Sequence, residues 1–199
     1  MGMKPLRKEI MGPLDDMIKV LWEGGIDNKP SYDVTYITLS LVLAQRSMDT
    51  STVHGCFLVA DDKGILACGY NGPIKGSIDE NIPMTRPEKY CHMIHSEENC
   101  MIAYDGDRGS IAGATMYISG PPCHRCMRMM LQKGIRNFVL GTIGSHCIDE
   151  ADEAAKVIML ENKSVNIKQF TNEDMDQVID LLERTKNYVL HKRQQGEQL

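Results

Sequence analysis

Two short segments of the chain carry side chains that together could hold a catalytic metal ion. One is a His-x-Glu at residues 95–97, and the other is a Cys-x-x-Cys at residues 123–126. The imidazole of His95 and the thiolates of Cys123 and Cys126 would make a three-ligand zinc site, which leaves one coordination position for water. Glu97 lies beside the histidine and could move the proton of that water. The pattern therefore favours a zinc-dependent hydrolase.

Other interpretations of the same two segments stay open. The cysteine pair could be a redox pair, although neither Trp nor Gly-Pro accompanies it. A closed structural zinc site would need a fourth ligand, and Glu97 would then have no task. The candidates for that ligand are His124, Cys91, His92 and Cys100. Because each segment falls at a predicted helix start, the combination favours zinc binding, and the presence of Glu97 favours the open, catalytic site.

The bulk composition limits the class of protein and its partners. With 199 residues, 42% of them hydrophobic and 25% charged, the chain suits one α/β domain with extensions. No apolar run approaches the roughly 20 residues that cross a bilayer, and residues 1–13 lack the apolar core of a secretory signal. Seven unevenly spaced cysteines fit a reducing compartment, so we expect a cytoplasmic protein. A net charge of −5 argues against a nucleic-acid partner, and we expect no membrane partner.

Apolar spacing and turn residues predict alternating helices and strands. The predicted helices cover about residues 32–46, 95–104, 122–133, 150–160 and 171–190, and the predicted strands cover 54–60, 65–70, 114–119, 138–140 and 164–170. Residues 61–64 predict a hairpin turn, and residues 71–94 predict a long loop.

Cap residues mark several of these boundaries. Ser31, and Thr171 with Asp174, predict N-caps, while Pro122 and Gly134 predict the start and the end of one helix. The alternation predicts an α/β catalytic domain over residues 31–170. Residues 1–30 are expected to be an N-terminal extension, and 171–199 a C-terminal helix with a flexible polar tail from residue 191.

The two metal-binding segments and their flanks resemble the zinc-dependent cytidine and deoxycytidylate deaminases. Beyond the metal motif, similarity to the deoxycytidylate branch is found at residues 44–50, at the Gly-Tyr-Asn-Gly turn of 69–72, at 95–99 and at the acidic segment 149–151. The resemblance covers about residues 32–170. It implies a three-layer α/β/α sandwich with a mixed five-stranded sheet.

The resemblance also implies a reaction. Zinc would be held by His95, Cys123 and Cys126, and Glu97 would carry the proton of the activated water to the pyrimidine ring and then to the departing amine. The outcome would be hydrolytic deamination of dCMP to dUMP and ammonia, which would feed dTMP synthesis.

Substrate contacts are implied in the same way. The backbone N–H of Ser96 would hold the ring carbonyl, the carbonyl of Pro121 would hold the departing amine, and Asn71 would contact the sugar. Arg46 and Ser47 would lie near the phosphate. For Arg46 a surface ion pair at a helix end is an equal alternative.

Three positions depart from the family pattern. Ser96 stands where alanine is usual, and Met48 where a basic residue is frequent. Other basic residues could then contact the phosphate, namely Lys75, Arg86 and Lys89. Residues 145–146 stand where an aromatic side chain often packs near the base, so a modified cytosine nucleotide is an alternative substrate.

Regulation and assembly are expected from the resemblance as well. Many members of the family are hexamers that dCTP with Mg²⁺ activates and dTTP inhibits, through a Gly-Tyr-Asn-Gly-x-Pro-x-Gly turn. The turn at residues 69–76 has its proline one place early. We therefore expect a homo-oligomer, with Gly72 and Lys75 as candidate effector contacts. Cys91 and His92 could hold a second, structural zinc.

Two competing functions remain. One is deamination of another cytosine nucleotide or of a nucleoside on the same fold. The other is a catalytically silent, nucleotide-sensing protein, for which the retained Glu97 would have no use.

Overall fold

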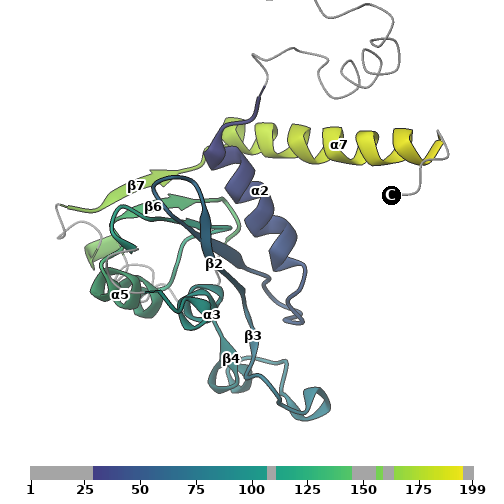
Figure 1. Ribbon diagram of the computed structural model, residues 1–199. Helices are drawn as coiled ribbons and strands as arrows, with labels where there is room; N and C mark the ends of the chain where they lie inside the picture. The colour runs from purple at the N-terminus through teal and green to yellow at the C-terminus, as the bar shows by residue number, and fades with distance from the viewer. Residues whose placement is uncertain (1–28, 107–110, 145–155, 159–163, 195–199) are drawn as a thin grey trace, which may run out of the picture.

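A five-stranded mixed sheet lies between two layers of helices in the computed structural model, which describes residues 29–106, 111–144, 156–158 and 164–194 (Figure 1). Helices α2 (Tyr32–Ala44) and α7 (Asn172–Gln194) cover one face of the sheet. Helices α3 (Ser96–Ala103) and α5 (His124–Lys133) cover the other. The predicted three-layer α/β/α sandwich is confirmed.

The sheet has the strand order β2-β1-β5-β6-β7. Its strands are β1 (Gly55–Val59), β2 (Ile65–Tyr70), β5 (Thr115–Ile118), β6 (Asn137–Leu140) and β7 (Asn166–Gln169). Strand β1 is antiparallel to both of its neighbours, whereas β5, β6 and β7 are mutually parallel. The predicted hairpin joins β1 to β2, and its residue Lys63 takes the left-handed conformation, with φ 72°.

The alternation of side chains along β1 explains why both faces of the sheet are covered. Cys56 and Leu58 belong to the apolar core beneath α3 and α5, while Phe57 and Val59 belong to the core beneath α2 and α7. All five residues of β1 are buried. A central strand of this kind requires helices on both sides, because successive side chains point to opposite faces.

Two of the predicted N-caps are confirmed by hydrogen bonds. Ser31 Oγ accepts from the N–H of Val34 at 3.2 Å at the start of α2. Thr171 and Asp174 accept from one another's N–H groups at 3.2 and 2.9 Å, which is the reciprocal pattern of a capping box before α7.

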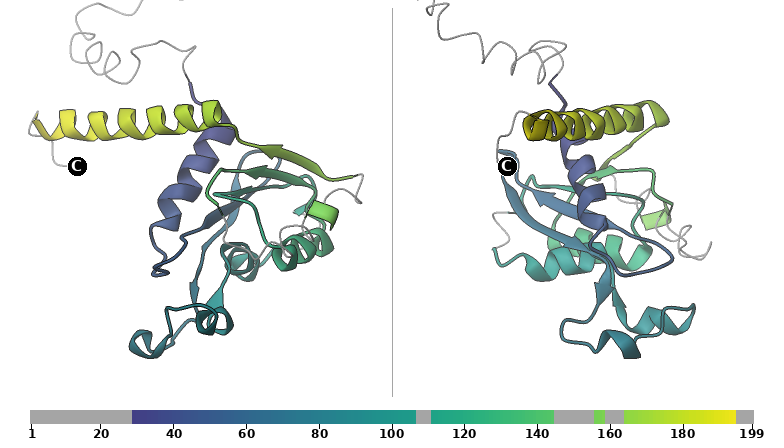
Figure 2. Two further views of the ribbon diagram at one scale, coloured as in Figure 1. Left: turned by 180° about the vertical axis from the view of Figure 1, so that it is seen from behind. Right: turned by 90° about the vertical axis from the view of Figure 1, so that its right-hand side faces the viewer.

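The end of α7 differs from the prediction. The helix continues to Gln194, so residues 191–194 are helical and not a polar tail. Lys, Arg and Gln are good helix formers, and polarity alone does not end a helix. The second half of α7 extends beyond the layer that α2 forms (Figures 1 and 2).

Residues 71–94 form short strands and 3₁₀ helices, whereas the sequence predicts a long loop. Strand β3 (Gly72–Pro73) pairs with β4 (Met93–Ile94), and between them lie the 3₁₀ helices η3 (Asp79–Asn81) and η4 (Glu88–Cys91). The segment forms a small lobe below the sheet in Figure 1. Turn residues at its ends indicated a loop, but short elements held by distant contacts leave little periodic signal.

The start of α5 is a third difference. The helix begins at His124 with Cys123 as its N-cap, so Pro122 precedes the cap instead of opening the helix. Gly134 ends the helix in the left-handed conformation, with φ 103°, as predicted.

Several predicted features lie outside the described residues. They are the N-terminal extension up to residue 28, the segments 145–146 and 149–151, most of the helix predicted at 150–160, and residues 195–199. The division into extension, catalytic domain and C-terminal segment stays a prediction. Over the described ranges, we find no helix that combines the length and the apolar character needed to cross a membrane.

Candidate active site

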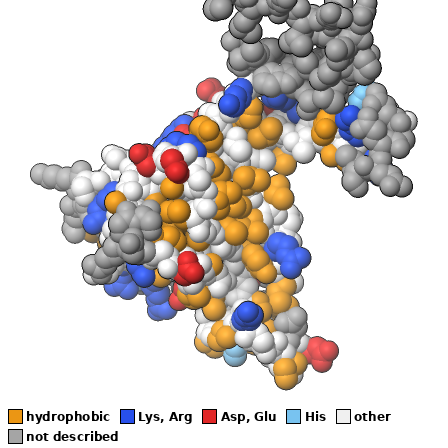
Figure 3. Space-filling model, viewed as in Figure 1, with side chains coloured by type: hydrophobic (Ala, Val, Ile, Leu, Met, Phe, Trp, Pro, Cys, Tyr) orange, Lys and Arg blue, Asp and Glu red, His pale blue; other side chains and the backbone are white. Residues whose placement is uncertain are grey.

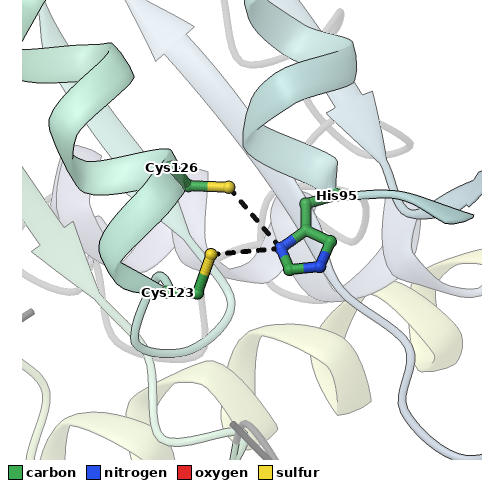
Figure 4. Close-up of side chains that lie close together, drawn as sticks. All are labelled: His95, Cys123 and Cys126. Carbon is green, nitrogen blue, oxygen red and sulfur yellow. Dashed lines mark hydrogen bonds between the residues drawn. The ribbon is translucent and has the colours of Figure 1, made fainter. Parts of the chain in front are cut away.

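The N-terminal ends of α3 and α5 meet and bring the three predicted metal ligands together (Figure 4). His95 is the N-cap of α3, Cys123 is the N-cap of α5, and Cys126 lies in the first turn of α5. The chain reaches Cys123 directly from the carboxyl end of β5, so the central sheet fixes the position of α5.

The distances between the three side chains suit zinc. His95 Nδ1 lies 3.4 Å from Cys123 Sγ and 3.5 Å from Cys126 Sγ, and all three ligand atoms lie within 4.8 Å of one another. Tetrahedral zinc with bonds of about 2.3 Å to sulfur and about 2.0 Å to nitrogen places such atoms about 3.5 Å apart. A single ion fits between them without rearrangement of either helix.

The cluster holds protonatable groups in a largely buried place. The hydrogen bond with Cys123 and burial both raise the pKa of the Cys126 thiol. The hydrogen bond with Cys123 and the nearby Glu97 carboxylate raise the pKa of His95 to about 9, against the effect of burial. A bound zinc ion would displace protons from these groups, because thiolate and neutral imidazole are the forms that bind metal.

No fourth protein ligand joins the cluster within the described ranges. His95, Cys123 and Cys126 form the one group of three or more potential metal ligands there, so the structure gives no second zinc site at Cys91 and His92. The Cys91 thiol instead donates to the carbonyl of Glu88 at 3.2 Å. As far as the described residues show, the donor set is therefore open, as a catalytic zinc requires.

Glu97 lies in the first turn of α3, two residues from His95, and only 4% of its surface is exposed. Burial raises the pKa of its carboxyl, while the proximity of His95 and the hydroxyl of Ser96 act in the opposite direction. Ser96 Oγ donates to Glu97 Oε2 at 2.8 Å. A buried carboxyl group beside an open metal site can accept and return protons, which is the task expected of Glu97.

Helix α3 packs closely on β2 and so fixes the turn that follows this strand. A Cβ atom at Gly69 would collide with the Ser96 carbonyl oxygen and the Cys100 nitrogen, so only glycine permits this approach. Asn99 Nδ2, one turn along α3, donates to the Tyr70 carbonyl at 2.9 Å. The Gly-Tyr-Asn-Gly turn is thereby placed beside the helix that carries His95 and Glu97.

Asn71 joins this turn to the segment before β1. Its Oδ1 accepts from the N–H of His54 at 2.7 Å, and its Nδ2 donates to the Thr52 carbonyl at 2.9 Å. The side chain is 8% exposed. An amide has a second N–H and further lone pairs, so contact with a sugar hydroxyl stays a prediction that these bonds permit.

The segment after α2 carries the residues expected near the phosphate. Arg46 is exposed, and the hydroxyl of Ser47 accepts from the N–H of Asp49 at 3.2 Å. The structure does not support a phosphate contact for Lys89. Its Nζ lies 2.7 and 2.8 Å from the two carboxylate oxygens of Asp49, and both side chains are buried.

The remaining predicted residues lie around this site. Pro121 is exposed in the link from β5 to α5. Gly72 pairs with Ile94 in the short β3–β4 ladder, and Lys75 is exposed in the lobe that follows.

His54 is a further residue of this region that its sequence pattern does not single out. Its Nδ1 lies 3.0 Å from Ser119 Oγ, and a Cβ at Gly120 would come within 3.0 Å of its ring. Through its backbone N–H, which donates to Asn71, and through its imidazole, His54 joins the Asn71 turn to the link that leads to Cys123. Its place just before the buried Gly55 was the one available signal, and a single histidine at a strand end is a weak one.

With this geometry in view, the comparisons with known proteins identify the family. Residues 30–142 match the family model of the cytidine and deoxycytidylate deaminase zinc-binding region, and the chain belongs to this family of zinc-binding deaminases. The human deoxycytidylate deaminase is 26% identical over 151 residues, which cover 73% of this chain and 83% of the relative. ComE operon protein 2 of Bacillus subtilis is 27% identical over 160 residues, which cover 78% and 79%.

A solved structure supports the fold. The dCMP deaminase of cyanophage S-TIM5, crystallised with dCMP and dUMP, superposes with a TM-score of 0.54 at 19% identity, over 71% of this chain and 98% of that protein. At this identity the likeness concerns the fold alone.

Metal analysis tests the cluster. We expect the purified protein to contain about one zinc ion per chain and the C126S variant to lose most of it, because two protein ligands hold zinc much more weakly than three. The exposed Cys91 provides the matched control, and C91S should keep the zinc content of the wild type. Elemental analysis by mass spectrometry gives the ratio. A wild-type protein without zinc, or a C126S variant with a full complement, would contradict the assignment.

Proposed function

We propose that the protein catalyses the hydrolytic deamination of dCMP to dUMP and ammonia in a zinc-dependent reaction. The observation that carries the proposal is the buried Glu97 in the first turn of α3, beside the open His95, Cys123 and Cys126 donor set. Membership of the zinc-binding deaminase family and relatives named as deoxycytidylate deaminases support it.

The residues of the chain divide the chemistry among them. His95, Cys123 and Cys126 would hold a zinc ion, whose Lewis acidity activates a water molecule for attack on C4 of the pyrimidine. Glu97 accepts one proton of that water and delivers it to N3. It then takes the proton of the hydroxyl now bonded to C4 and gives it to the amine, so that ammonia leaves and C4 becomes a carbonyl carbon. The N–H of Ser96 would orient the ring through its carbonyl oxygen, and the Pro121 carbonyl would accept from the amine.

A basic residue close to Asn71 indicates whether the substrate is a nucleotide, which carries a phosphate, or a nucleoside, which does not. Arg86 Nη2 donates to Thr52 Oγ1 at 3.3 Å, and Thr52 also accepts from Asn71 through its carbonyl. Arg86 is exposed and retains further N–H groups for a second acceptor. We propose Arg86 as the principal phosphate contact, with Arg46 and Ser47 as the alternative.

Two other functions remain as alternatives within the same site. Residues 145–146, where the family often places an aromatic side chain, lie outside the described residues, so a C5-modified cytosine nucleotide stays an alternative substrate. A nucleotide-sensing protein without catalysis would not need Glu97 buried beside the metal ligands.

Allosteric control and self-association belong to the same proposal. We propose that dCTP with Mg²⁺ and dTTP act as effectors through Gly72 and Lys75. We further propose a homo-oligomer, a hexamer by resemblance, because apolar side chains gather on the surface over α2, where Leu39 and Val42 are exposed (Figure 3). Exposed Ile179 and Leu182 of α7 add to the apolar surface of this layer. Free cysteines throughout the described residues fit a cytoplasmic protein.

An ammonia-release assay across dCMP, 5-substituted dCMP, CMP, deoxycytidine and dCTP tests the activity directly. Each substrate is measured with and without dCTP–Mg²⁺ or dTTP, and light scattering after size exclusion gives the oligomeric state. dCMP should have the highest kcat/KM. Inertness toward every cytosine derivative would favour the nucleotide-sensing alternative.

Glu97 can be tested apart from the metal site. The E97Q variant should keep its zinc but lose at least about a thousandfold in kcat, because an amide cannot take up and return the protons that the Glu97 carboxylate transfers. The exposed neighbour Glu98 supplies the control, and E98Q should turn over dCMP at the wild-type rate. Substantial turnover by zinc-loaded E97Q would refute the assigned mechanism.

Arg86 can be tested by comparing a nucleotide with a nucleoside. R86M should raise KM for dCMP about tenfold, the usual cost of one charge-assisted hydrogen bond, and should leave kcat/KM for deoxycytidine unchanged. R46M is the comparison, since Arg46 is exposed at the end of α2. If R46M raises KM for dCMP and R86M does not, the phosphate lies at Arg46 instead.

A further inference from the structure

A buried hydroxyl, that of Ser96, lies beside the carboxylate of Glu97. Ser96 Oγ donates to Glu97 Oε2 at 2.8 Å. Ser96 is fully buried, and Glu97 is 4% exposed. The first turn of α3 therefore carries both the proposed base and a hydroxyl that is hydrogen-bonded to it.

Ser96 restricts the orientation of Glu97 more than its backbone alone would. A glutamate side chain has three rotatable bonds, and burial removes the water that would otherwise hydrogen-bond to its oxygens. The hydroxyl fixes the position of Oε2. Under the proposed function we assign the proton transfer to the other oxygen, Oε1, with which Ser96 makes no hydrogen bond.

The packing in turn restricts Ser96. Its carbonyl lies against Gly69 of β2, where a Cβ atom would collide with the carbonyl oxygen. Cys56, on the face of β1 that α3 covers, is fully buried, as is Ser96. The Glu97 carboxylate is therefore the hydrogen-bond partner of a hydroxyl that is withdrawn from water, and alanine at this position would supply no such donor.

We propose that Ser96 is a positioning residue for the proton transfer, acting through its hydroxyl on Glu97, in addition to any contact that its backbone makes with substrate. The inference rests on the proposed deamination. It concerns the residue at which this chain departs from the alanine usual in the family.

A purely structural role is the competing explanation. A buried hydroxyl needs a partner, and the carboxylate of Glu97 could simply satisfy it. The two roles differ in what they change. A structural role affects stability and zinc content, whereas a positioning role lowers kcat and leaves KM and zinc content unchanged.

The S96A variant and a matched control separate these roles. Ser40 is also fully buried, and its hydroxyl donates to the carbonyls of Tyr36 and Tyr117 at 2.8 and 3.3 Å, in the layer opposite the site. S40A thus removes a buried hydroxyl without touching Glu97. Both variants and the wild type are measured for zinc content, melting temperature, and kcat and KM with dCMP.

We expect S96A to lose roughly tenfold in kcat, as for one hydrogen bond to a charged group, with KM and zinc content as in the wild type. S40A should keep its kcat even where its melting temperature falls. The inference is overturned if kcat of S96A stays within twofold of the wild type, if S96A loses zinc together with activity, or if S40A loses kcat equally. If the wild-type protein is inactive on every cytosine derivative, the proposed function itself is wrong.

Discussion

The convergence of two helix N-termini on one metal-binding cluster is the constraint on which the rest of the structure depends. His95 and Cys123 are N-caps of different helices, 28 residues apart in sequence, and yet Nδ1 and Sγ lie 3.4 Å apart. Both helices pack on the same face of the sheet, and the two cysteines are buried while His95 is half-buried. The hydrogen bond with Cys123 and burial raise the pKa of the Cys126 thiol, so a metal ion that binds there must displace the proton of this thiol.

Polar contacts hold together the segments around Asn71, to one side of the metal-binding cluster. Asn71 joins the turn after β2 to the segment before β1, and Asn99 joins the same turn to α3. Lys89 fastens the 71–94 lobe to Asp49 through a buried ion pair. Removing one partner of such a pair typically costs about 3–5 kcal/mol, because the other charge is left buried and unpaired. The lobe is thus held against the segment that precedes β1.

Features that are held by residues close together in the sequence could be predicted from it, whereas features that are held by residues far apart could not. The Cys-x-x-Cys segment, the hairpin at residues 61–64 and the capping box at Thr171 are local patterns. The structure confirms the hairpin and the capping box, and it brings the predicted ligands His95, Cys123 and Cys126 together. The three-layer α/β/α fold was predicted from the resemblance to the deaminase family. The Lys89–Asp49 pair joins residues 40 apart, and no local pattern distinguishes Lys89 from an exposed loop lysine. His54 likewise acquires its place only when Ser119, 65 residues later, is folded against it.

The Lys89–Asp49 pair also bears on how an acidic protein can hold an anionic substrate. Burial acts to raise the pKa of Asp49, but Lys89 and the N–H groups of Ser51 and Thr52 outweigh it and lower that pKa below its usual value. Asp49 is therefore ionised at neutral pH, close to the segment proposed to meet the phosphate. An uncompensated carboxylate there would repel the substrate. Lys89 neutralises Asp49, so that Arg86, hydrogen-bonded to Thr52, sets the local sign of the charge despite a net charge of −5. Under the proposed function, Lys89 supports phosphate binding indirectly, by cancelling a neighbouring charge and without reaching the nucleotide itself.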